Sequence, residues 1–123
     1  MLLSPLIIAL GLAAAEPPTD LASPPLIAHP TYERVPTDVQ FTTYYPKAAM
    51  RQGVTGKVVM ECTVAPSGEL RSCSILSETP TGYQFGENAL KLKAFFRVQR
   101  PEGPCPRDVC AIVRIPIKYN LAP

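Results

Sequence analysis

The stretch YPKAAMRQGVTGKV, residues 45–58, combines a helix start, a helix stop and the beginning of a strand in one short segment. Pro46 suits the first helical position, where its missing N–H costs nothing. Gly53 suits the left-handed conformation that ends many helices. We therefore expect a helix over residues 46–52. Because this helix is short, packing against the rest of the protein rather than intrinsic propensity must stabilise it.

A β-hairpin is predicted directly after this segment. Apolar residues alternate with polar ones over residues 57–64, which is typical of a strand with one buried face. Residues 66–68, Pro-Ser-Gly, are suited to a tight turn. A second strand then follows over residues 69–76. The buried face of the first strand is expected to carry Val58, Met60, Cys62 and Val64.

The second strand contains an irregularity in its apolar pattern. The phase slips by one position between Leu70 and Cys73, which predicts a β-bulge near residues 71–72. Counting from a three-residue turn, Val64 faces Leu70, and the extra residue then places Cys73 opposite Cys62. Directly opposed residues have Cβ atoms close enough for a disulfide. We therefore expect a Cys62–Cys73 bond.

Four cysteines in a small domain are typical of an exported, oxidised protein. With Cys62 and Cys73 paired, Cys105 and Cys110 remain to close a small loop, although four cysteines allow three pairings. Zinc is the alternative, but the spacing contains no C-x2-C knuckle, and the single histidine, His29, lies outside the predicted domain. No metal site is therefore expected.

A second, longer helix is predicted over residues 85–98. Phe85, Ala89, Leu92 and Phe96 recur at i, i+4, i+7 and i+11, which forms one apolar stripe. The net charge of +2, with 18% charged residues, is too mild to indicate binding to nucleic acid. The late cluster of basic residues is interpreted as a solvated helix face whose cations suit a helix C-terminus; it comprises Lys91, Lys93, Arg97 and Arg100.

The last strand is predicted over residues 109–119, where apolar residues alternate again. Pro116 within this run indicates a strand at the border of the sheet, because proline cannot donate to a ladder. A right-handed crossover can place this strand beside the first one. We therefore expect an α+β fold: a short helix, then β-β-α-β, with a three-stranded antiparallel sheet of order 2-1-3. The long helix covers one face, and both outer strands are open.

The N-terminal part of the chain is predicted to lie outside this domain. Residues 1–15 are almost wholly apolar and end in Ala13-Ala14-Ala15, the pattern of a signal peptide cleaved before Glu16. This segment has no Lys or Arg, so a short membrane anchor with an upstream start is the alternative. Residues 16–43 are rich in proline and predict an extended linker. The folded domain is expected over residues 44–121.

Taken in order, these patterns resemble the TonB C-terminal domain family. The resemblance covers about residues 44–121. The family's opening pattern, YPxxAxxxGxxGxV, is matched by Tyr45, Pro46, Ala49, Gly53, Gly56 and Val58. The later patterns of the hairpin, the helix and the closing strand are matched by Val64, Gly68, Ala89, Leu90, Phe96, Ile115, Pro116, Ile117 and Tyr119.

The resemblance implies a periplasmic module of Gram-negative bacteria. Energy-transducing members are anchored in the inner membrane and bind the TonB box of outer-membrane receptors, which adds as a strand along the edge of the last strand. It therefore implies a partner-binding edge; its residues here are Ala111, Ile112, Val113, Arg114 and Ile115. The alternative is a merely solvated edge protected by Arg114, Pro116 and Lys118.

Three departures from the energy-transducing members affect the expected function. This chain has a leader predicted to be cleaved and only a modest linker; its cysteines are not part of the family pattern; and the segment 105–110 stands where it can restrict the edge strand. No catalytic residue or cofactor site is expected, because no second reactive group converges on Glu78. Cys62 and Cys73 lack the C-x-x-C arrangement of a redox pair, which favours a static bond.

We therefore expect a periplasmic module, and not an enzyme, that captures an extended peptide in TonB-dependent transmembrane transport. The alternative is a secreted, disulfide-stapled structural domain of the cell envelope without a transporter link. The expected partner is a protein or peptide, with the TonB box of an outer-membrane receptor as the candidate. Membrane association and a homodimer are left open.

Overall fold

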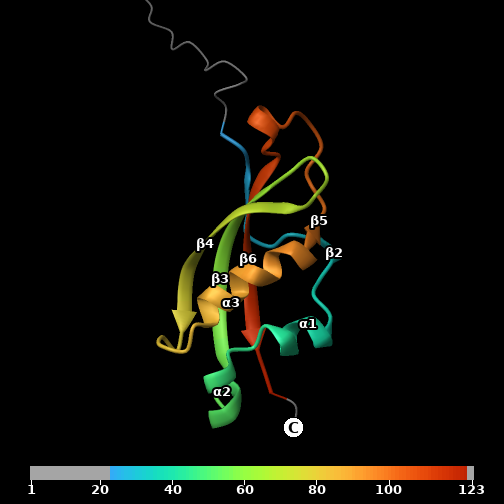
Figure 1. Cartoon of the computed structure of the whole chain (residues 1–123). Coiled ribbons are helices and arrows are strands. Elements are labelled where there is room, and N and C mark those ends of the chain that lie inside the picture. Colours follow the sequence, from blue (N-terminus) through green and yellow to red (C-terminus); the bar gives the residue numbers. More distant parts are fainter. Residues whose placement is uncertain (1–22, 122–123) are drawn as a thin grey trace, which may run out of the picture.

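The computed structural model describes residues 23–121 and shows an α+β fold (Figure 1). A four-stranded sheet of order β1-β6-β3-β4 is covered on one face by α3, and β2 and β5 form a second, two-stranded sheet. The elements are β1 (Leu26–Ile27), β2 (Tyr32–Arg34), α1 (Asp38–Thr43), α2 (Lys47–Gln52), β3 (Gly56–Val64), β4 (Leu70–Thr79), α3 (Phe85–Leu92), the 3-10 helix η2 (Lys93–Phe95), β5 (Arg97–Val98), the 3-10 helix η3 (Pro106–Asp108) and β6 (Ala111–Tyr119).

The expectation of a three-stranded sheet is wrong in one respect. The predicted order 2-1-3 corresponds to β4-β3-β6, and these three strands do pair antiparallel in that order. A fourth strand, β1, adds parallel to the outer side of β6, with Leu26 opposite Ile112 and Ile27 opposite Val113. The reason is that Leu26 and Ile27 are apolar residues within a proline-rich segment, and pairing with β6 partly buries Ile27 against the core.

The predicted short helix is confirmed as α2. Pro46 precedes its first residue, and Gly53 ends it with a φ of 71°. The N–H of Val54 then donates to the carbonyl of Ala49 at 2.8 Å, and the Tyr45 hydroxyl donates to the carbonyl of Val54. Tyr45 and Ala49 are buried, so packing stabilises a helix that is too short to be stable alone.

The predicted hairpin is confirmed in β3 and β4, including its register. Val64 lies opposite Leu70 and Cys62 opposite Cys73, with the expected shift between these two pairs. A second shift, which the sequence did not indicate, leaves Leu76 unmatched between Met60↔Ile75 and Val59↔Ser77. The edge strand β4 therefore carries two irregularities.

The predicted long helix ends earlier than expected. Helix α3 stops at Leu92, and after η2 the backbone at Phe96 is extended, with φ −99° and ψ 143°. The next residues form β5, where Val98 pairs with Tyr32, and the Val98 N–H donates to the Gly68 carbonyl at 2.9 Å. Phe96 is nevertheless buried with the rest of the predicted stripe, because the turn of η2 keeps it facing the core.

Part of the range expected to be a linker, 16–43, is folded onto the domain: it contains β1, β2 and α1. A capping box between Thr37 and Gln40 begins α1. Phe41 from this helix then packs edge-on against Tyr119, with ring centroids 6.1 Å apart. The expected leader, residues 1–15, lies outside the described residues. Among residues 23–121, no helix is long and apolar enough to cross a membrane.

Candidate functional site

The five residues predicted to bind a partner form the first half of β6. Ala111, Val113 and Ile115 are buried against the core, whereas Ile112 is half-buried and Arg114 exposed on the opposite face. Their side chains therefore alternate between the core and the open face of the sheet. What this segment can offer a partner is its main chain, together with the side chains of Ile112 and Arg114.

Among residues 23–121, the outer side of β6 is covered only at its beginning. The N–H of Ile112 points outward and donates to the carbonyl of Pro25 at 2.8 Å. Because backbone groups alternate in direction along a strand, those of Arg114, Pro116 and Lys118 point outward as well. Beyond Val113, none of the strands within residues 23–121 pairs with this side of β6. Pro116, which has no N–H, therefore stands where no ladder bond is lost, as expected for an edge.

The side chain of Arg114 lies across the sheet, on the opposite side from this edge. Its Nε is 3.1 Å from Oε2 of Glu61, which stands opposite it on β3. Both groups are partly exposed, so the pair adds little to stability. Its effect is to hold a long cationic side chain away from the outer edge, which leaves the main chain there accessible to an added strand.

A cavity of about 520 Å³ lies between α1 and the end of β6. Its walls include Phe41, Tyr45, Lys118, Tyr119 and Leu121. The Tyr119 hydroxyl is buried, and no group among the described residues forms a hydrogen bond with it. Burial raises the pKa of this hydroxyl above its ordinary value. No pattern in the sequence indicated this cavity, because its wall on α1 comes from the range expected to be a linker.

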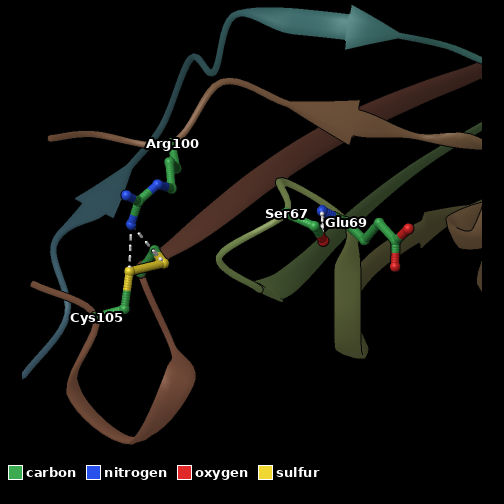
Figure 2. Close-up of a disulfide and its surroundings, with 5 residues drawn as sticks. Ser67, Glu69, Arg100 and Cys105 are labelled. Atoms are coloured by element: carbon green, nitrogen blue, oxygen red, sulfur yellow. Dashed lines mark hydrogen bonds between the residues drawn. A yellow bond between two sulfur atoms is a disulfide. The ribbon is translucent and has the colours of Figure 1, made fainter.

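Both predicted disulfides are present, and they lie in different surroundings. Cys62–Cys73 joins opposed residues of β3 and β4, and Cys105–Cys110 closes the loop before β6. Arg100 approaches the second bond and donates to both sulfur atoms (Figure 2). This arginine was expected on a solvated helix face; it lies beyond the helix because α3 ends at Leu92.

All four cysteines are disulfide-bonded, so none is available to bind zinc. Within residues 23–121, no cluster of three His, Cys, Asp or Glu side chains could hold a metal ion. Glu78 is half-buried on β4, beside Gly86 of α3.

The residues of the opening motif determine the fold and are not exposed as a binding surface. Tyr45, Ala49 and Val58 are buried in the core. Gly56 stands against the ring of Phe85, and a Cβ atom at this position would be 2.6 Å from it. The rings of Tyr45 and Phe85 are in edge contact, with centroids 5.8 Å apart. The motif thus brings α2, β3 and α3 together.

Comparison with known families identifies this arrangement. Residues 42–121 match the family described as the C-terminal domain of the Gram-negative bacterial TonB protein. No curated protein matches the chain. The family consists of non-catalytic interaction domains of the Gram-negative cell envelope, which contact proteins such as outer-membrane receptors. Because the match covers most of the chain and all of the central β3, β4, α3 and β6 unit, this protein belongs to the TonB C-terminal domain family.

Proposed function

We propose that this protein is a periplasmic module that captures an extended, TonB-box-like peptide by strand addition along the outer edge of β6, as part of TonB-dependent transmembrane transport. The observation that carries this proposal is that the edge already accepts an added strand, because β1 pairs there with Ile112 and Val113. An edge that pairs with a segment of its own chain has the geometry needed to pair with a peptide.

The peptide takes the positions that β1 occupies. The proposed contact residues, 111–115, include both positions paired with β1, so the incoming strand displaces β1 and continues toward Lys118. Two residues of β1 make a short ladder, and Leu26 remains largely exposed. Such a strand can be replaced by a longer one that forms more main-chain hydrogen bonds.

The other edge of the sheet is less suited to this role. The two register shifts in β4 interrupt its ladder, and such irregularities discourage the addition of further strands. The exposed residues of β4 are mainly polar, although Leu76 is half-exposed at the second shift. A partner strand, or a second copy of this chain forming a dimer, is therefore better accommodated at β6 than at β4.

The pairing of β1 with the beginning of β6 also supports the alternative, a structural domain of the cell envelope without a transporter link. In this alternative β1 stays on β6 permanently and protects the edge, in the way that natural proteins cover exposed strands. The two proposals differ in one measurable property, which is whether β1 leaves β6 when a peptide is added.

Amide hydrogen exchange followed by NMR tests the proposal on the folded, oxidised protein. A TonB-box peptide should slow exchange at Arg114 and Lys118 and accelerate it at Ile27. A peptide of the same composition in scrambled order serves as the control, and the amides of β4 serve as internal references. Unchanged exchange at all three positions with the TonB-box peptide would overturn strand addition at β6 and favour the structural alternative.

The proposed location has a separate test. Fractionation of Gram-negative cells followed by N-terminal sequencing should find a periplasmic protein that begins at Glu16. An intact Met1 in the inner-membrane fraction would instead support a membrane-anchored form facing the periplasm, and would contradict cleavage.

A further inference from the structure

We infer that the Cys105–Cys110 disulfide is a site of thiol–disulfide exchange with a dithiol, and that Arg100 stabilises the thiolates formed there. Nη1 of Arg100 lies 2.6 Å from Sγ of Cys105 and 3.3 Å from Sγ of Cys110 (Figure 2). One guanidinium group thus faces both sulfur atoms of the bond. This inference is independent of peptide capture at β6.

The charge of Arg100 is available to these sulfur atoms. The two salt bridges found within residues 23–121 join Arg97 to Glu69 and Arg114 to Glu61. Arg100 belongs to neither, so no carboxylate among the described residues forms a salt bridge with its guanidinium. A cation beside a cysteine favours the thiolate over the thiol, and exchange is faster when the departing sulfur leaves as a stabilised thiolate.

The exposure of the two sulfur-bearing residues decides the direction of attack. Cys105 is half-exposed, whereas Cys110 is only 2% exposed. A thiolate of the dithiol therefore attacks Sγ of Cys105, forms a new S–S bond with it, and breaks the Cys105–Cys110 bond. The electron pair of the broken bond passes to Sγ of Cys110, which leaves as a thiolate beside Arg100.

The second thiol of the same molecule completes the exchange. After losing its proton, it attacks the dithiol's own sulfur in the mixed disulfide and expels Cys105 as a thiolate, again beside Arg100. The dithiol is oxidised to a disulfide by two electrons, and the two cysteines are reduced. The two protons released by the dithiol balance the two that the cysteines take up as thiols. The reactant class is therefore a dithiol, in a small molecule or in a reducing protein.

The other disulfide serves as an internal control. Cys62 is 1% exposed and is bonded to Cys73, which lies directly opposite it in the sheet and is half-buried, as Cys105 is. None of the hydrogen bonds recorded among the described residues brings a cation to either of its sulfur atoms, in contrast to the two donated by Arg100. The two disulfides are thus similar in exposure, and the cation beside Cys105–Cys110 is the feature that distinguishes the bond proposed for exchange.

Opening the Cys105–Cys110 bond would affect the start of β6. Within the closed loop, Arg107 and Asp108 adopt positive φ values of 53° and 64°, which are unfavourable for residues with side chains. The N–H of Cys110 donates to the carbonyl of Val64 at 2.8 Å, directly before the β3–β6 ladder begins. Reduction removes the covalent tie that holds this loop, so order at the first residues of β6 would decrease.

The experiment compares the two disulfides in the folded protein. Oxidised protein is treated with dithiothreitol under native conditions, trapped by alkylation at intervals, and analysed by peptide mass spectrometry. Cys105–Cys110 should open at least tenfold faster than Cys62–Cys73. The variant Arg100→Gln should slow the opening of Cys105–Cys110 several-fold, and Arg100→Lys should restore part of the rate. Arg51→Gln, which removes the same charge from the exposed side of α2, is the matched control and should change neither rate.

A second measurement separates an electrostatic role of Arg100 from a structural one. In the reduced protein, the rate of alkylation of Cys105 and Cys110 is followed against pH. Arg100→Gln should move the midpoint to higher pH, whereas loss of packing alone would not. The other charged groups between residues 99 and 110 are Glu102, Arg107 and Asp108, and they are unchanged in both proteins. Equal opening rates for the two disulfides, or an Arg100→Gln protein with unchanged rate and midpoint, would overturn the inference.

Discussion

Replacing Ile27 by Asp should strengthen the binding of a TonB-box peptide to β6. Ile27 is the residue of β1 that packs against the core. An Asp side chain at this position would bring a charge against the core, which is unfavourable, so β1 should detach from β6. A ladder of about two hydrogen bonds, each contributing on the order of 1 kcal/mol net, and the partial burial of one Ile together favour the paired state. Ordering these two residues costs about 1–2 kcal/mol each, so the preference for paired β1 is on the order of 1 kcal/mol.

This preference sets the size of the expected effect. If the peptide must displace β1, its apparent affinity is reduced by the fraction of molecules in which the edge is free. Removing a bias of about 1 kcal/mol should therefore tighten binding by about fivefold, since each 1.4 kcal/mol corresponds to a factor of ten. The same substitution should lower the free energy of unfolding by no more than about 2 kcal/mol, because it removes only this contact.

Fluorescence anisotropy with a labelled peptide measures the affinity, and circular dichroism verifies that the variant is folded. Val35→Asp is the matched control: it introduces the same charge in the same N-terminal region, at a side chain that is 50% exposed. This control should leave the affinity within about twofold of wild type. If folded Ile27→Asp protein binds the peptide no more tightly than Val35→Asp does, β1 does not compete for the edge, and the reasoning is refuted.

Three further predictions concern stability. Phe85 is fully buried and packs against Tyr45 and Tyr119, so Phe85→Ala should lower the free energy of unfolding by about 3–5 kcal/mol in urea denaturation; a loss below 1 kcal/mol would contradict its central place in the core. Tyr119→Phe should raise stability by about 1 kcal/mol, because it removes a buried hydroxyl that has no partner among the described residues. Burial raises the pKa of this hydroxyl in the folded state, whereas in the unfolded chain the hydroxyl ionises at about pH 10. The free energy of unfolding of the wild type should therefore be independent of this group below about pH 10 and should fall as the pH rises above that value. The wild type should lose more stability than Tyr119→Phe in alkaline titrations, and parallel curves would argue against burial of the hydroxyl. Replacing Cys62 and Cys73 together by Ala should lower the free energy of unfolding by about 3 kcal/mol, measured by thermal denaturation of the otherwise oxidised protein. An unchanged melting temperature would show that this bond does not stabilise the protein by restricting the conformations of the unfolded chain.

Several features of this protein could be predicted from the sequence because their causes lie within a few residues. The start of α2 depends on Pro46 and its end on Gly53. The hairpin depends on alternation along one strand and on a turn of a few residues. The slip in the apolar phase of β4 was enough to place Cys62 opposite Cys73, since each residue of a strand has a fixed direction. The family followed from the same local patterns in their order.

Other features could not be predicted, because they depend on contacts between distant parts of the chain. The end of α3 is one example: the apolar stripe continues to Phe96, but pairing of Val98 with Tyr32 requires an extended backbone there. Arg100 is another, since its contact with Cys105 exists only because the helix stops early. In both cases a local pattern is compatible with two conformations, and a remote partner selects one.

The binding edge shows this division most clearly. The sequence by itself determined that residues 111–115 lie in a border strand, because alternation and Pro116 are local signals, and the right-handed crossover rule then placed this strand next to β3. Only the tertiary structure decided that this edge is partly covered, since two apolar residues in a proline-rich segment have no strong preference of their own. Leu26 and Ile27 become a strand because the adjacent core and the backbone of Ile112, which would be unpaired without them, offer burial and hydrogen bonds that the isolated segment cannot provide.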